Sequence, residues 1–273
     1  MGFLNLADAA TRLIWSEEDA HALSRVANSF RESDPYTIWL HEQGDRWYWT
    51  FLRECTEEDE AAMIHLQTKF FSGYVDNLRA ALNYLAYQTA VFSLIEYPTL
   101  QGKLNPNTVE FPIFNDSGLF RQHNRIKQLP QKYFDWIEHV QPYHGRTDGL
   151  WILHELSREN RHRLLHPVAF HPFGKVGGLF SDNLPDSAED VDITYSGGGL
   201  KHGQDLCSFT SSVPFDPHNY PKIQISIGVD HPICETKPLV QAMNEMASDV
   251  YSILTAANEG EPIIQGNVFP LTF

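Results

Sequence analysis

The sequence predicts an α+β fold, in which a helical core packs against an antiparallel sheet made of an N-terminal hairpin and C-terminal strands. Residues 36–53 hold two aromatic and β-branched runs around Gly44-Asp45, a pattern typical of a β-hairpin. Residues 56–95 carry apolar side chains at helical spacing. After Pro167 the apolar residues alternate with polar ones, which is the period of strands.

Helices are predicted on both sides of the hairpin. Residues 7–32 form the first. The second begins at Thr56, where Asp59 takes the place of Glu in a capping box, and runs to about Ile95. Residues 119–140 form one helix or two short ones broken near Pro130, and residues 237–258 form a closing amphipathic helix. The second helix presents one apolar stripe: Phe71, Tyr74, Val75, Leu78, Leu82, Leu85 and Thr89.

The remaining segments are predicted as strands and loops of one domain. Residues 97–118 are a loop whose FPIF run, residues 111–114, is an extended piece held on the core by its apolar side chains. The three tryptophans of the hairpin mainly cover the core, with a ligand-binding face as the alternative. No linker separates helices from strands, so residues 1–260 are predicted to form a single domain and residues 261–273 a tail. Four strand segments are expected to join the hairpin in one sheet: residues 168–171, 190–195, 205–209 and 222–227.

Composition restricts the classes of function. The 273 residues carry a net charge of −15, which argues against a broad nucleic-acid or anionic-membrane surface but leaves room for a local basic cleft. The chain has no run of eighteen apolar residues, and its start does not resemble a signal peptide, so no membrane partner is expected. Three widely spaced cysteines predict a cytoplasmic protein without a structural disulfide.

The stretch from Leu150 to Val168 is the densest group of polar side chains with chemical potential. We predict one helix that Pro167 stops, packed against the second helix around Leu78–Gln88. Asn160 falls inside its apolar stripe and should bond a polar group on a neighbouring helix, because an unsatisfied buried amide costs about 1–3 kcal/mol. The other members of that stripe are Ile152, Leu153, Leu156 and Leu164. Small residues beside Arg79 and Asn83 would let Asn160 and Arg161 dock there.

The polar face of this stretch, which by helical spacing includes His154, allows three interpretations. His162 and His166 are four residues apart, a spacing that could place both on one metal ion, although no HExxH motif is present. Alternatively, Arg161 stabilises the phosphorane and a histidine moves the proton in RNA cleavage. The third interpretation is a solvated face of weak ion pairs, each contributing only tenths of a kcal/mol. We adopt the second as the hypothesis, without metal ligands or a cofactor.

Four pieces occur in a characteristic order: Leu78–Asn83 (LRAALN), Phe111–Ile113 (FPI), Gln141–Tyr143 (QPY) and Leu156–Arg163. Together they resemble a group of uncharacterised bacterial proteins that show an LRSALD-like helix, an FPI segment, a QPY turn and an N-x-DKHR-like helix. The resemblance covers roughly residues 36–170. Here Asn replaces the Asp usual at positions 83 and 160, Arg161 replaces Lys, and Arg158 replaces Asn. The missing carboxylates argue against an acid/base or metal role at positions 83 and 160.

More distantly, a helical core with Arg161-x4-His166 resembles the HEPN class of nucleotide-binding and RNA-cleaving helical domains. The resemblance implies a metal-independent endoribonuclease of toxin or defence type, RNA as the partner, and a homodimer, because HEPN sites usually form across one. The candidate catalytic residues are Arg161, His162 and His166. The candidate supporting residues are Arg79, Asn83, Ser157, Arg158 and Asn160. The alternative is a non-catalytic protein-binding or scaffold protein with an acidic surface.

Overall fold

A computed structural model describes most of the chain. The described residues are 4–124, 126–145, 148–162, 165, 167–170, 187–194, 200–212, 226–234 and 237–258. They divide into two compact units. The helical unit comprises the described residues within Met1–Ala22, Phe70–Leu164 and Gln241–Thr272. The sheet unit comprises those within Leu23–Lys69 and Leu165–Val240, and α1 and α2 contribute residues to both.

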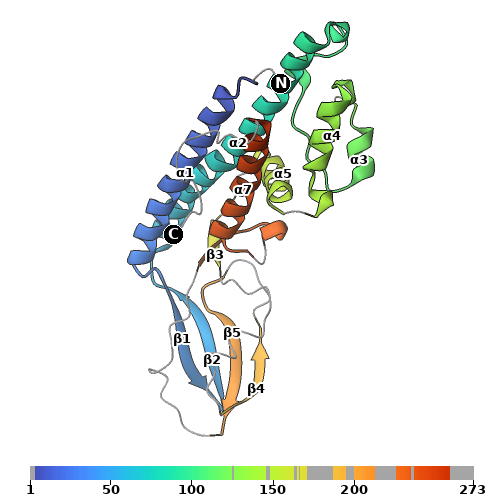
Figure 1. The fold of residues 1–273 in the computed structure, drawn as a ribbon. Coiled ribbons are helices and arrows are strands. Elements are labelled where there is room, and N and C mark those ends of the chain that lie inside the picture. Colours follow the sequence, from blue (N-terminus) through green and yellow to red (C-terminus); the bar gives the residue numbers. More distant parts are fainter. Residues whose placement is uncertain are drawn as a thin grey trace. The chain divides into compact units, whose positions relative to one another are not determined.

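The α+β prediction, with a helical core and an antiparallel sheet, is confirmed (Figure 1). The prediction of a single domain over residues 1–260 stays a prediction, and the tail 261–273 lies outside the described residues. No helix in the described part of the chain is both long and apolar enough to span a membrane. The larger helices are α1 (Ala7–Glu32), α2 (Glu57–Glu96), α3 (Ser117–Gln122), α4 (Gln131–His139), α5 (Gly149–Asn160) and α7 (Leu239–Ala257).

The core of the helical unit is built on α2. Every residue of its predicted apolar stripe is buried, which confirms the stripe. The predicted cap at Thr56 also forms, since its hydroxyl accepts a hydrogen bond from the Asp59 amide at 3.1 Å. Helix α7 packs on α2, where the Tyr74 hydroxyl donates to the Met243 carbonyl at 2.7 Å. Pro130 precedes α4, so residues 119–140 hold two short helices, one of the two predicted arrangements.

The predicted hairpin is confirmed in register. Strands β1 (Tyr36–Gln43) and β2 (Arg46–Arg53) pair antiparallel across a two-residue turn in which Gly44 has φ 71°. Such a positive φ favours glycine. Strands β5 (Gln204–Ser211) and β4 (Ala188–Ile193) extend the sheet in the order β1-β2-β5-β4. Trp49 is buried with Phe51 in the core of this sheet, as predicted for a tryptophan that covers the core. Trp39 is 52% exposed and does not have that role.

The prediction that all the C-terminal strands join the hairpin is wrong. Strand β3 (Pro167–Phe170) pairs with β6 (Ser226–Val229) in a separate two-stranded sheet. Alternation marks a segment as a strand but contains no information about its partner, which depends on long-range packing. Part of the predicted strand 222–227 and the triple glycine 197–199 lie outside the described residues.

The prediction that the stretch from Leu150 to Val168 is one helix is wrong at its C-terminal end. Helix α5 ends at Asn160, Arg161 and His162 form a turn, and Pro167 begins β3. Proline sets the latest residue at which a helix has to stop. Helix α5 ends before that limit, so Pro167 does not determine where it stops. The predicted buried positions Ile152, Leu153 and Leu156 are confirmed.

Candidate functional site

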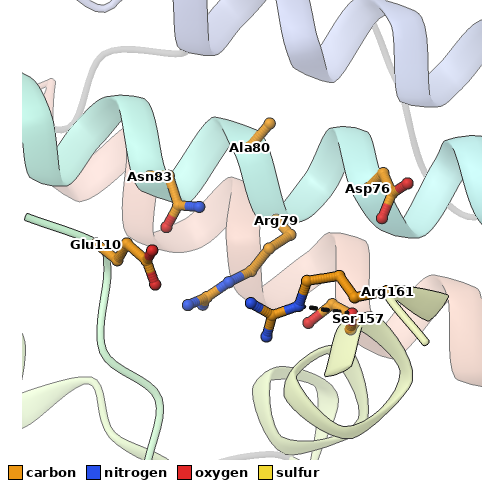
Figure 2. Close-up of a pocket in the computed structure, with 7 residues that line it drawn as sticks. All are labelled: Asp76, Arg79, Ala80, Asn83, Glu110, Ser157 and Arg161. Atoms are coloured by element: carbon orange, nitrogen blue, oxygen red, sulfur yellow. Dashed lines mark hydrogen bonds between the residues drawn. The ribbon is translucent and has the colours of Figure 1, made fainter. Parts of the chain in front are cut away.

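A pocket of about 190 Å³ lies between α2, α5 and the residue that precedes the FPI segment (Figure 2). It brings together four of the predicted site residues from positions far apart in the sequence. The prediction that Arg161 docks beside Arg79 and Asn83 on α2 is therefore confirmed in its geometry. The lining residues are Asp76, Arg79, Ala80, Asn83, Glu110, Ser157 and Arg161.

Arg79 and Asn83 hold the backbone of Phe111 from one side of α2. One terminal nitrogen of Arg79, Nη2, donates to the Phe111 carbonyl at 2.7 Å. The side-chain oxygen of Asn83, Oδ1, accepts from the Phe111 amide at 3.1 Å. The two residues are four apart and so share a helix face, with the small Ala80 beside them. The LRAALN and FPI motifs are thus two halves of one hydrogen-bonded contact.

The second terminal nitrogen of Arg79, Nη1, is buried and has no hydrogen-bond partner among the described residues. Burial lowers the pKa of Arg79 to about 10. The carboxylate of Glu110 opposes this shift and the charge of Arg161 adds to it. Arg79 remains a cation at neutral pH, with one donor that nothing described in the protein satisfies.

Arg161 enters the pocket from the end of α5. Its Nε donates to the carbonyl of Ser157, one turn earlier, at 3.3 Å. Figure 2 shows its guanidinium beside that of Arg79 in the space between the two helices. Arg161 is exposed, so it is the more accessible of the two cations.

Two supporting residues act on the backbone rather than inside the pocket. The Ser157 hydroxyl donates to the His154 carbonyl at 3.0 Å. Asn160 donates to the Ser72 carbonyl of α2 at 3.4 Å, as expected for an amide that needs a partner on a neighbouring helix. Its bond is to Ser72, however, and not to the face of Arg79 and Asn83, and its Oδ1 is buried without a partner among the described residues.

Arg158 and His162 do not line the pocket. Arg158 forms an ion pair with Glu155 at 2.7 Å, and its side chain is 60% exposed. This matches the interpretation as a solvated face. His162 is exposed in the turn that follows α5. His166, the histidine of the Arg161-x4-His166 pattern, lies outside the described residues, as does Arg163.

His154 was assigned by spacing to the solvated face, but in the structure it is half-buried and stacks on Trp151, with ring centroids 5.2 Å apart. Burial lowers the pKa of His154 to about 4, and the charges of Arg79, Arg158 and Arg161 add to the effect. It is therefore a neutral imidazole at pH 7. Helical spacing offered no signal for this burial.

This depressed pKa predicts a pH-dependent loss of stability. Above the ordinary histidine pKa of 6.5 the residue is neutral in both the folded and the unfolded state and contributes nothing. As the pH falls from 6.5 to about 4, the unfolded chain binds a proton that the folded chain does not, so stability is lost. We expect a loss on the order of 1–2 kcal/mol, discounted for partial exposure.

Urea unfolding of the wild type and of His154→Gln across this pH range measures the effect. The difference in unfolding free energy between the two proteins should stay constant above pH 6.5 and shift in favour of the variant below it. A constant difference over the whole range would contradict the expected neutral imidazole.

Two pocket residues, Asp76 and Glu110, were not among the predicted site residues. Glu110 directly precedes the FPI segment, so its adjacency to Phe111 was the available signal. The described residues contain no group of three or more histidine, cysteine or acidic side chains arranged to hold a metal ion. None of the three cysteines forms a disulfide.

Comparisons of the chain with protein-family models, with curated proteins and with solved structures found no match. The resemblance to uncharacterised bacterial proteins and to HEPN domains therefore stays an expectation. The pocket between α2 and α5 is therefore the basis for the proposed function.

Proposed function

We propose that the protein is a metal-independent endoribonuclease of HEPN-like type whose phosphate-binding residue is Arg161. The observation that supports this most is the entry of Arg161 into a pocket with a second arginine, Arg79, from another helix. Paired guanidinium groups are suited to stabilise the charge that develops on a phosphorane. The remaining roles are proposed from the sequence.

In the proposed reaction the ribose 2′-oxygen attacks the phosphorus and the bond to the 5′-oxygen breaks, which leaves a 2′,3′-cyclic phosphate and a free 5′-hydroxyl. One histidine takes the proton from the 2′-hydroxyl, and a proton is returned to the 5′-oxygen as it leaves. We assign these transfers to His162 and His166. Arg161 holds the non-bridging oxygens. A homodimer would bring two such sets of residues together.

The test is cleavage of labelled RNA in EDTA and in Mg²⁺ by the wild type and by Arg161→Ala, His162→Ala and His166→Ala. Arg161→Ala should lower the rate about 100-fold or more, the typical effect of removing one group that stabilises developing charge. Arg158→Ala is the matched control, because Arg158 is three residues from Arg161, carries the same charge and does not line the pocket. It should cleave at the wild-type rate.

Two results would oppose the proposal. The first is the absence of cleavage by folded wild type. The second is cleavage that Arg158→Ala and Arg161→Ala weaken equally, since a diffuse charge effect would explain it. Circular dichroism of each variant establishes that the fold is retained.

A protein-binding role is the second candidate, and one observation favours it. Trp39 is 52% exposed on β1 and stacks on His41, with ring centroids 4.1 Å apart. Exposed tryptophan is enriched at the centres of protein interfaces. If the wild type cleaves no RNA, loss of a captured protein partner in Trp39→Ala would support this role.

A further inference from the structure

We propose that the pocket between α2 and α5 is a binding site for one tetrahedral oxyanion, such as phosphate, held by Arg79, Arg161 and the side-chain amide of Asn83. The site would serve the proposed ribonuclease by holding the phosphate of its substrate. Oxyanion binding itself does not depend on cleavage, so the two proposals can be tested separately.

Among the described residues, the hydrogen bonding of Arg79 is incomplete. A guanidinium presents five donors in a planar fork. The fork of Arg79 uses Nη2 for the Phe111 carbonyl, while Nη1 is buried and without a described partner. A buried charged donor without an acceptor is costly, more so than a neutral one. An anion in the pocket would supply that acceptor.

Arg161 and Asn83 also present donors to the pocket. Among the described residues, the only hydrogen bond of the Arg161 side chain is the one from Nε, so its terminal nitrogens are available. The oxygen of Asn83 is occupied by the Phe111 amide, which leaves its NH₂ group to donate. Arg79, Arg161 and Asn83 therefore offer hydrogen-bond donors to the pocket, and this chemistry matches an oxyanion.

Two carboxylates, those of Asp76 and Glu110, also line the pocket. Asp76 and Glu110 are exposed, and within the described structure neither forms an ion pair with Arg79 or Arg161. The two acids offset the formal charge of the two arginines, so the site depends on its directed donors rather than on a net positive charge. A cavity of about 190 Å³ has room for such an ion with several waters, at about 30 Å³ per water.

The test is calorimetric titration of inorganic phosphate into the folded wild type, with ionic strength balanced by sodium chloride. Wild type should bind, and Arg161→Gln should bind about tenfold more weakly or worse, since a hydrogen bond to a charged group contributes about 1.5–3 kcal/mol. Arg158→Gln, the matched loss of a positive charge from the same helix, should bind like wild type.

Glu110→Gln should change the phosphate affinity in the opposite direction, and it tests whether the ion lies in this pocket. Removing this carboxylate should tighten phosphate binding about two- to fivefold, because a repulsive charge at the pocket is lost. Arg79→Lys keeps the charge but loses the fork, so it should retain the fold and weaken binding. If these residues only supported the fold, Glu110→Gln would not tighten phosphate binding while Arg79→Lys weakens it.

The proposal is overturned if folded wild type does not bind phosphate, if Arg158→Gln weakens binding as much as Arg161→Gln, or if Glu110→Gln fails to tighten it. Phosphate binding without RNA cleavage would defeat the ribonuclease and leave the oxyanion site in place. RNA cleavage that requires Arg161, without phosphate binding in this pocket, would defeat the oxyanion site and leave the ribonuclease in place.

Discussion

Gly149→Ala is expected to destabilise the protein by about 3 kcal/mol or more, the upper part of the range for overpacked interiors. Gly149 begins α5 where that helix meets α7. A methyl group at this position would overlap the backbone carbonyl of Glu245 and lie 2.7 Å from the Asp249 carboxylate. That carboxylate accepts a hydrogen bond from the Leu150 amide at 2.9 Å, so the substitution would also disturb the cap of the helix.

A loss of stability in Gly149→Ala is informative, because alanine is otherwise favoured over glycine in helices by up to about 1 kcal/mol. Chemical denaturation measures the change in unfolding free energy. Gly118→Ala is the control, since Gly118 is an exposed glycine in the first turn of α3, where an added methyl group would meet the side chain of Asp116 at 3.0 Å and no backbone atom. The control should change stability by less than about 1 kcal/mol. Equal stability of Gly149→Ala and wild type would disprove the close approach of α5 and α7.

Gln141→Leu is expected to cost a similar amount, about 3 kcal/mol or more, for a different reason. Gln141 is 1% exposed and all its side-chain bonds reach the backbone. Its oxygen accepts from the Phe114 amide at 2.9 Å, and its nitrogen donates to the carbonyls of Pro112 and Ile137, each at 3.0 Å. Leucine is similar in size but satisfies none of these groups, and each unsatisfied buried group costs about 1–3 kcal/mol.

The matched control for this substitution is Gln131→Leu. Gln131 is exposed on α4 and bonds only the side chain of Asp135 among the described residues. Its replacement should change the unfolding free energy by about 0.5 kcal/mol or less. If Gln141→Leu and Gln131→Leu change the unfolding free energy equally, the buried hydrogen bonds of Gln141 are contradicted.

Sequence reasoning predicted the features that depend on local patterns. The apolar stripe of α2, the Thr56 cap and the hairpin around Gly44 each follow from spacing within one element. The meeting of Arg161 with Arg79 and Asn83 was also predicted, because small residues beside an arginine and an amide on one helix invite close packing by another helix. The QPY and FPI motifs were recognised as segments, but their connection through Gln141 was not, since no spacing links residues so far apart.

The wrong and missing predictions share a physical cause, which is dependence on distant partners. The partner of β3 is β6, and alternation within β3 contains no information about it. The charge of Arg79 on α2 adds to the lowered pKa of His154, and helical periodicity within α5 contains no information about such a neighbour. Glu110 belongs to the pocket only because Phe111 is held by α2.

The cap of α5 also has a consequence for the order in which the chain folds. The side chain of Asp148 does not cap this helix, and the Leu150 amide instead bonds Asp249, a residue 99 positions later. During synthesis the chain therefore reaches the end of α5 long before the group that completes its first turn has left the ribosome. Such distant contacts form late, because the entropy of closing a long loop is lost before the contact can compensate for it. The first turn of α5 is completed only after α7 has been made and has docked.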